Sequence, residues 1–236
     1  MVQDLNSFIK KSIEPKAKAH ELAKKQREIG VAEFFSRNRH LLGFDNKRKA
    51  LLTTIKEAVD NALDACEETN VLPEINIQLI EIKEERYKII VEDNGPGIVE
   101  KEIPNVFGRL LYGSRFGSGK QSRGQQGIGI SAAIMYGQLT TGRSATVTSK
   151  VESEECATRI TMKLDISKNR GIVDNALTKK IVWREENTTD EFGVAVEKES
   201  GTRIEFALKG KYREGRPSVF EYIKSTAIVN PHASII

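Results

Sequence analysis

The residues from Leu51 to Cys66, LLTTIKEAVDNALDAC, constrain the fold more than any other stretch of this chain. Apolar residues recur there every three or four positions, a spacing that gathers them on one buried side of an α-helix. They are Leu51, Leu52, Ile55, Ala58, Val59, Ala62, Leu63 and Cys66. Glu57, Asn61 and Asp64 fall within about 60° of one another on the opposite side.

This polar ridge is open to two interpretations. A solvated helix face is the ordinary one for a Glu or Asp in so charged a chain. However, the ridge contains no Lys or Arg, and Asn is a mediocre helix former with no obvious reason to lie in mid-helix. A carboxylate such as Glu57 on a rigid helix can take a proton from water. The carbonyl oxygen of Asn61, one turn later, suits a hard cation such as Mg²⁺.

Composition sets the broad class of protein. The 236 residues are enough for one large domain, or for one domain and an arm, and they are 30% charged and 39% hydrophobic, as in a globular protein. The net charge of +4 is too small to indicate a nucleic-acid partner by itself, although basic residues cluster in the first 30 residues and at 47–49. Two cysteines without metal-ligand spacing favour a reducing compartment. No apolar run is long enough for a bilayer, so we expect a cytoplasmic protein without a membrane partner.

The pattern of elements predicts an α+β fold. Residues 1–30 form a basic arm, and 31–236 form one domain in this interpretation. Helices are expected at 31–42, 51–66, 130–136 and 218–229, and strands at 75–79, 87–91, 145–151, 158–164, 180–184 and 202–208. Strand clusters mixed with helices indicate a two-layer sandwich of a mixed, mostly antiparallel sheet with helices on one face. Residues 230–236 resemble the start of another strand, so we expect the chain to continue in a longer protein.

A turn-forming segment follows the strand expected at 87–91. It reads Asp93-Asn-Gly95-Pro-Gly97. An Asp at a strand end can accept a hydrogen bond from an exocyclic amine such as that of adenine, and glycines let the backbone approach a flat ligand. An ordinary β-turn is the alternative, since these dipeptides are common in turns. Thr202 opens a later strand and matters here only if it lies beside Asp93.

Nine of the 18 glycines lie between Gly95 and Gly129. The last of them, in Gly124-Gln-Gln-Gly-Ile-Gly129, open the helix expected at 130–136, and backbone N–H groups at a helix N-terminus bind phosphate. Neither the dinucleotide-binding glycine order nor a Walker A loop is matched. A flexible loop is the alternative, but Arg115, Lys120 and Arg123 nearby favour phosphate.

Taken in order, these motifs resemble the ATP-binding family shared by DNA gyrase, the large heat-shock chaperones, histidine kinases and mismatch-repair MutL proteins. The resemblance runs from about residue 46 to residue 208. It is closer still to the B subunits of archaeal-type DNA topoisomerase VI, through segments 34–44 (FFSRNRHLLGF), 111–116 (LYGSRF), 122–131 (SRGQQGIGIS) and 230–233 (NPHA).

This resemblance implies a role for each candidate. Glu57 would orient the water that attacks the γ-phosphate, and Asn61 would bind Mg²⁺ together with the phosphates of ATP. Asp93 would hydrogen-bond the adenine amine with support from Thr202, and Asp64 would belong to the outer part of that network. The remaining candidates would line the nucleotide or close over it as a lid: Gly95, Gly97, Ser114, Arg115, Arg123, Gly124, Gln125, Gln126, Gly127, Ile128, Gly129 and Ile130.

The resemblance also implies partners. ATP would clamp two copies around double-stranded DNA, with the 1–30 arm as a strap across the dimer partner, while an A subunit supplies the DNA-cleaving tyrosine. In this family a lysine from a following transducer domain contacts the γ-phosphate, and this chain ends before such a domain. We therefore expect ATP binding with slow hydrolysis or none. The alternatives are another ATPase or kinase of the same superfamily, a nucleotide-gated dimerisation module without turnover, and a plain structural domain.

Overall fold

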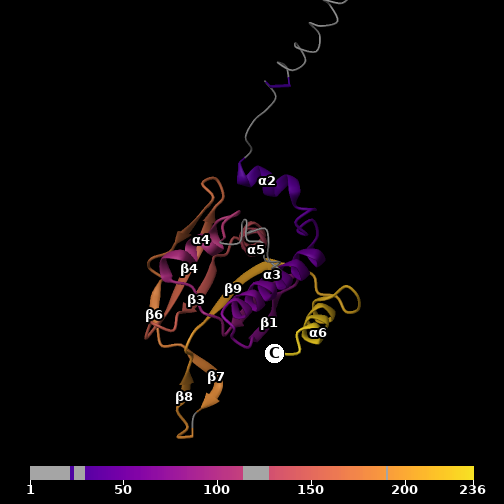
Figure 1. Cartoon of the computed structure of the whole chain (residues 1–236). Helices are drawn as coiled ribbons and strands as arrows, with labels where there is room; N and C mark the ends of the chain where they lie inside the picture. Colours follow the sequence, from indigo (N-terminus) through magenta and orange to yellow (C-terminus); the bar gives the residue numbers. More distant parts are fainter. Residues whose placement is uncertain (1–21, 24–29, 114–127, 190) are drawn as a thin grey trace, which may run out of the picture.

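The structure is a computed structural model that describes residues 22–23, 30–113, 128–189 and 191–236 (Figure 1). Its centre is an eight-stranded sheet in the order β10-β1-β2-β9-β3-β4-β5, with β6 also paired to β4. The strands are β1 (Glu74–Lys83), β2 (Arg86–Asp93), β3 (Ala145–Lys150), β4 (Ala157–Asp165), β5 (Arg170–Val173), β6 (Lys179–Ile181), β9 (Gly201–Lys209) and β10 (Ser234–Ile235). Every pairing is antiparallel except that of β10 with β1.

The helices of the described residues are α2 (Val31–Asn38), α3 (Lys47–Glu68), α4 (Ile103–Gly108) after a 3₁₀ turn at Glu100–Glu102, α5 (Gly129–Thr141) and α6 (Val219–Val229). Of these, α3, α4 and α5 pack on one face of the sheet. Helices α3 and α5 contact each other and lie on β9, while α6 packs on the outer side of α3 (Figure 1). A separate hairpin of β7 (Arg184–Thr189) and β8 (Ala195–Glu197) projects from the sheet. The expected α+β sandwich is confirmed.

Successive side chains of β2 and β9 point to opposite faces of the sheet. The cross-strand neighbours Ile89 and Phe206 are buried in the core under the helices. Residues one position along point the other way, and there the side chains of Lys88 and Arg203 form ion pairs with Glu205 at 2.7 Å and 3.2 Å. A one-residue slip would exchange these faces, so the pattern fixes the register.

The ends of α3 follow from its sequence. Asn46 caps the N-terminus, because its side-chain oxygen accepts hydrogen bonds from the backbone N–H groups of Arg48 and Lys49. Asn70, with φ at 57°, turns the chain after the C-terminus. The apolar stripe predicted along this helix is buried, with Leu52 only partly covered.

Several boundaries differ from the sequence prediction. The helix expected at 31–42 ends at Asn38, and the helix expected at 130–136 starts one residue earlier and continues to Thr141, before the left-handed Gly142. The strand expected at 180–184 is divided between β6 and β7. The sequence analysis missed α4, β5 and β8, because segments of three to six residues are too short for a periodic signal. The strand expected near the C-terminus is present as β10.

Both cysteines are free thiols. Among the helices of the described ranges, none has the length and hydropathy needed to span a bilayer.

Candidate functional site

A cavity of about 960 Å³ lies between α3, α5 and the ends of strands β2 and β9. Its volume is in the range of small-molecule sites. Five of the predicted site residues that line it come from four different elements, α3, β2, α5 and β9: Glu57, Asn61, Asp93, Gly129 and Thr202. Segments up to 145 positions apart in the chain therefore meet in one site, as the motif order predicted.

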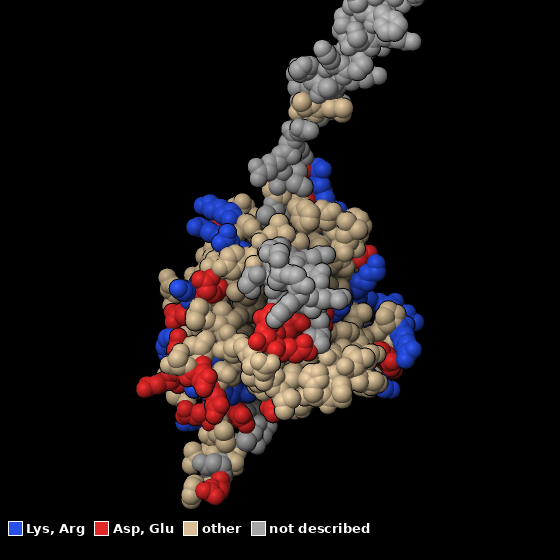
Figure 2. All heavy atoms as spheres, viewed as in Figure 1, with Lys and Arg blue, Asp and Glu red and all other residues tan. Residues whose placement is uncertain are grey.

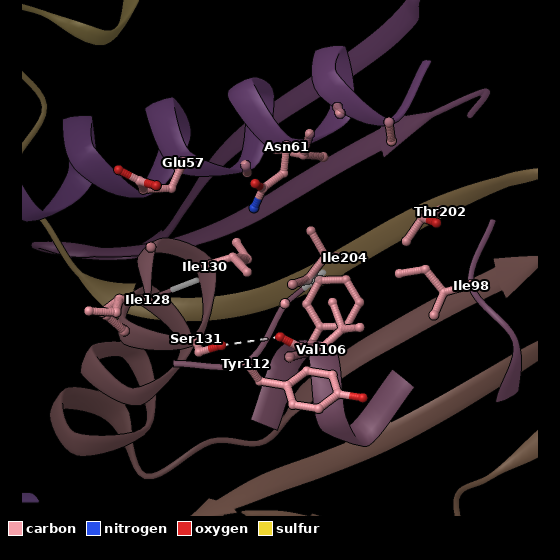
Figure 3. Close-up of a pocket in the computed structure, with 18 of the residues that line it drawn as sticks. Glu57, Asn61, Ile98, Val106, Tyr112, Ile128, Ile130, Ser131, Thr202 and Ile204 are labelled. Atoms are coloured by element: carbon pink, nitrogen blue, oxygen red, sulfur yellow. Dashed lines mark hydrogen bonds between the residues drawn. The ribbon is translucent and has the colours of Figure 1, made fainter. Parts of the chain in front are cut away.

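One side of this cavity, which we call the helix side, consists of Glu57 and Asn61 on α3 and Gly129 on α5 (Figure 3). Glu57 and Asn61 are one helical turn apart and extend from α3 into the cavity. Burial of its carboxyl group, and then the nearby Asp60 carboxylate, raise the pKa of Glu57, while Lys56 opposes the shift. A raised pKa makes a carboxylate a better proton acceptor near neutral pH.

Gly129 leaves room for the carboxylate of Glu57 in its present position. A Cβ atom at position 129 would lie 1.8 Å from the Oε2 atom of Glu57, so any side chain there would displace the carboxylate. Gly129 is also the first residue of α5, where backbone N–H groups have no partner within the helix. The helix side thus places a carboxylate, an amide and a helix N-terminus around one space.

The opposite side, which we call the strand side, consists of Asp93 and Thr202 at the ends of β2 and β9, with Ser149 of β3 bonded to Thr202 behind them. Oδ1 of Asp93 accepts hydrogen bonds from the backbone N–H groups of Gly95 (2.9 Å) and Thr202 (3.2 Å). Removal from water raises the pKa of Asp93 to about 7, although these two hydrogen bonds oppose the shift. Within the described part of the chain, no donor is bound to its second oxygen, so that oxygen can accept a ligand hydrogen bond.

Ser149 ties the strand side together. Its hydroxyl donates to the carbonyl of Gly201 at 3.0 Å and accepts from the backbone N–H of Ile98 at 2.8 Å. Because a serine hydroxyl carries a single proton, Thr202 must be the donor in its 3.1 Å hydrogen bond with Ser149. Thr202 therefore supports Asp93 through its backbone N–H and not through its hydroxyl.

A family comparison decides what kind of site this is. Residues 50–195, more than half of the chain, match the model of the "Histidine kinase-, DNA gyrase B-, and HSP90-like ATPase" family. The chain belongs to this ATPase family. The match covers Glu57, Asn61, Asp93 and Gly129, and membership implies that the chain binds a nucleotide.

Individual relatives of this ATPase agree. The chain is 50% identical over 212 residues to the B subunit of type 2 DNA topoisomerase 6 from Archaeoglobus fulgidus, a match that covers 89% of the chain and 33% of that protein. The chain thus spans about a third of the length of the curated relatives that it matches.

Two solved structures share the fold at low identity. The ATPase region of Saccharomyces cerevisiae topoisomerase II is 14% identical, with a TM-score of 0.52 over 88% of this chain and 58% of that one. The 43K ATPase domain of Thermus thermophilus gyrase B is 17% identical, with a TM-score of 0.52 over 86% and 47%.

Some of the predicted residues line the cavity and others do not. Gly97, Ile128 and Ile130 line it, but Gly95 does not. Gly97 has φ at 74°, and a Cβ atom there would lie 2.0 Å from the carbonyl oxygen of Lys150, so it is needed for strand packing. Asp64 is 3% exposed and does not line the cavity, so it does not share the open ridge of Glu57 and Asn61. Seven predicted residues lie outside the described ones: Ser114, Arg115, Arg123, Gly124, Gln125, Gln126 and Gly127.

The sequence analysis missed residues that organise the strand side. Ser149 lies inside a strand and carries no local motif. Asn94 was treated only as a turn residue, yet its side chain accepts from the backbone N–H of Glu74 and donates to the carbonyl of Leu72. These contacts hold the end of β2 against the α3–β1 connection. Its position inside the Asp-Asn-Gly turn was the only available signal.

Charge on the visible surface is mixed. Figure 2 shows both signs on this face in separate groups, with acidic side chains at the centre and lower left and basic ones at the upper left and right. In the ranges that the structure describes, no group of three or more His, Cys, Asp or Glu side chains could hold a metal ion by itself.

Proposed function

We propose that this chain is the ATP-binding and ATP-hydrolysing part of a type IIB DNA topoisomerase B subunit. The observation that carries the proposal is the common cavity of Glu57, Asn61, Asp93 and Thr202, closed on the α5 side by Gly129. The 50% identity to the B subunit of a type 2 DNA topoisomerase 6 supports the choice of this enzyme within the ATPase family.

Glu57 is the proposed base. It orients water toward the γ-phosphate and accepts the proton of that water. Its raised pKa suits this role, because a carboxylate with its ordinary pKa is a weak base at neutral pH. The contact with Gly129 holds its carboxylate beside the N-terminus of α5, where phosphate oxygens bind favourably.

Asn61 is the proposed protein ligand of Mg²⁺. A single amide oxygen fits this ion when phosphates and water supply the other ligands, as is usual for Mg²⁺ in nucleotide sites. The lack of a carboxylate cluster in the described residues is consistent with such a shared site. When bound, Mg²⁺ neutralises charge that develops on the phosphates.

Asp93 is the proposed adenine ligand, through the oxygen that the backbone N–H groups leave open. Thr202 supports it, and Asp64 belongs to the outer part of the network. Residues 114–130 would then follow the phosphates, with Gly124 to Ile130 as part of a lid.

The proposed assembly goes beyond one chain. Residues 31–236 would form the ATP-binding domain and residues 1–30 a strap across a second copy. ATP-driven closure of this homodimer around double-stranded DNA would accompany cleavage by an A subunit. ATP and Mg²⁺ are the cofactors of this cycle.

Binding linkage gives the first test. At about 100 times the dissociation constant, a ligand stabilises the folded state by about 2.7 kcal/mol, which for a chain of this size raises the melting temperature by about 5 to 10 °C. We expect this shift for the 236-residue chain with Mg²⁺ and a non-hydrolysable ATP analogue. Asp93→Asn should abolish it, because the amide of Asn would meet the adenine amine donor to donor.

Asp165→Asn is the matched control, since Asp165 also ends a strand but bonds Ser167 at the surface. It should keep the full shift. ATP turnover, measured in the same samples, separates an ATPase from a dimerisation module that only binds. A wild-type chain that shows no shift would contradict the proposed site.

A further inference from the structure

We propose that Tyr222 of α6 is a positioning residue for Glu57, acting through Asp60. The inference rests on the proposed function, because it assumes that Glu57 is the base. Nothing in the sequence motifs points to Tyr222, which lies more than 160 positions after Asp60.

The contact itself is specific. The hydroxyl of Tyr222 donates a hydrogen bond to Oδ1 of Asp60 at 2.9 Å and approaches the carbonyl oxygen of Lys56 at 3.5 Å. Positions 56 and 60 flank Glu57 along α3, so one side chain from α6 reaches both neighbours of the base. Packing of α6 on α3 would need only apolar contacts. A polar contact at this turn therefore suggests a role beyond burial.

Burial makes this hydrogen bond consequential. Asp60 is 9% exposed, and a carboxylate taken out of water is costly unless it receives hydrogen bonds. A hydrogen bond to a charged group contributes more than one between neutral groups. The tyrosine hydroxyl thus favours one orientation of the Asp60 side chain, three residues after Glu57.

The Asp60 carboxylate of this pair acts electrostatically on Glu57. The groups that act on it are Lys56 and Asp60 from its own helix, and the carboxylate touches Gly129 of α5 on the other side. Glu57 and Asp60 both act on the Tyr222 hydroxyl in turn. A change at Tyr222 therefore reaches the base by an electrostatic route as well as through the α3 backbone.

The position of α6 gives the contact a second consequence. Helix α6 leads directly into β10, which pairs with β1 at the edge of the sheet. Movement of α6 relative to α3 would loosen the hydrogen bond to Asp60. The turn of α3 that carries Glu57 would then shift with any contact that moves α6.

The test is ATP hydrolysis by the 236-residue chain, measured as kcat and KM, together with the melting shift caused by a non-hydrolysable analogue. Tyr222→Phe should lower kcat about three- to tenfold while KM stays within about twofold, because a displaced base slows the step without changing nucleotide contacts. Combined with Asp60→Asn, the loss should not exceed that of the larger single variant, as expected for residues acting in series.

Tyr212→Phe is the matched control. It removes the same hydroxyl from a tyrosine near α6 that lines a separate apolar groove. Both constants should match the wild type. A Tyr222→Phe variant with wild-type kcat overturns the inference, whether or not its KM and melting temperature change.

The outcome also separates this inference from the proposed function. If Glu57→Gln hydrolyses ATP at the wild-type rate, the base assignment fails and this inference fails with it. If the wild type hydrolyses ATP and Glu57→Gln does not, the base stands, and Tyr222→Phe alone decides.

Discussion

The two sides of the cavity are built on different principles. On the strand side, the groups that hold Asp93 are the backbone N–H groups of Gly95 and Thr202, and Ser149 ties the neighbouring backbone together. On the helix side, Glu57 and Asn61 are single side chains on one face of α3, and Glu57 lies close to Gly129. Redundant backbone contacts suit recognition of a rigid base, whereas a single side chain suits proton transfer. The strand side should therefore tolerate the loss of one hydrogen bond better than the helix side tolerates a small displacement.

The largest effect is expected on the helix side, for Glu57→Gln. This variant keeps the shape of the side chain but removes the base, so ATP turnover should fall about 10²- to 10⁴-fold. The melting shift with the analogue should remain, since no nucleotide contact is lost. Glu67→Gln on the exposed side of the same helix is the control, and turnover at the wild-type rate by Glu57→Gln would remove Glu57 from the mechanism.

Gly129→Ala should have the second-largest effect, because it moves the proposed base Glu57 without removing it. The added Cβ atom would lie 1.8 Å from Oε2 of Glu57, and the end of that side chain can rotate away. A displacement of about 1 Å at a reacting group can cost as much as 10²-fold in rate, so we expect a loss of at least about tenfold in kcat.

Gly113→Ala is the matched control for this variant. Gly113 also lines the cavity, but nothing lies within 4 Å of a Cβ atom built there. Equal turnover of the two alanine variants would mean that the contact between Gly129 and Glu57 has no catalytic consequence.

The same contrast explains what the sequence revealed. Glu57 and Asn61 could be predicted because helical periodicity fixes which residues share a face, and Asp93 because a turn motif marks a strand end. Asp64 obeys the same periodicity, yet it is buried. This burial could not be predicted, because the local sequence does not indicate which elements cover α3 near its C-terminal end.

Long-range contacts mark the limit of sequence reasoning. Ser149 faces Thr202 only because β3 pairs with β9 in one register, and Tyr222 meets Asp60 only because α6 folds back on α3. Neither contact has a local pattern. The fold class was predictable from alternation and helix spacing, but which distant residues complete the site was not.

Ser149→Ala should have a smaller effect, on the strand side. It removes the hydrogen bonds of the Ser149 hydroxyl with Ile98, Gly201 and Thr202, while Asp93 keeps both of its own. A neutral hydrogen bond contributes about 0.5 to 1.5 kcal/mol, and none of the three is made to Asp93, so nucleotide affinity should fall only about three- to tenfold. Titration of the analogue measures this, with Ser167→Ala at the surface as the control. A loss as large as that of Asp93→Asn would refute the redundancy inferred for the strand side.

The smallest effect concerns stability without nucleotide. The pKa of Asp93 is raised to about 7, so between about pH 4 and pH 7 the folded chain holds a proton that the unfolded chain has released. Stability linked to this group is therefore present at low pH and lost as the pH rises through 7. Asn cannot lose such a proton. Relative to the wild type, the melting temperature of Asp93→Asn should therefore rise by at least about 3 °C between pH 5 and pH 8, since one pKa unit corresponds to about 1.4 kcal/mol. Taking the difference between variant and wild type cancels the titration of the other carboxylates. A difference that does not change between pH 5 and pH 8 would show that the carboxylate is not held at a cost to folding, and that the strand side is no less stable for containing it.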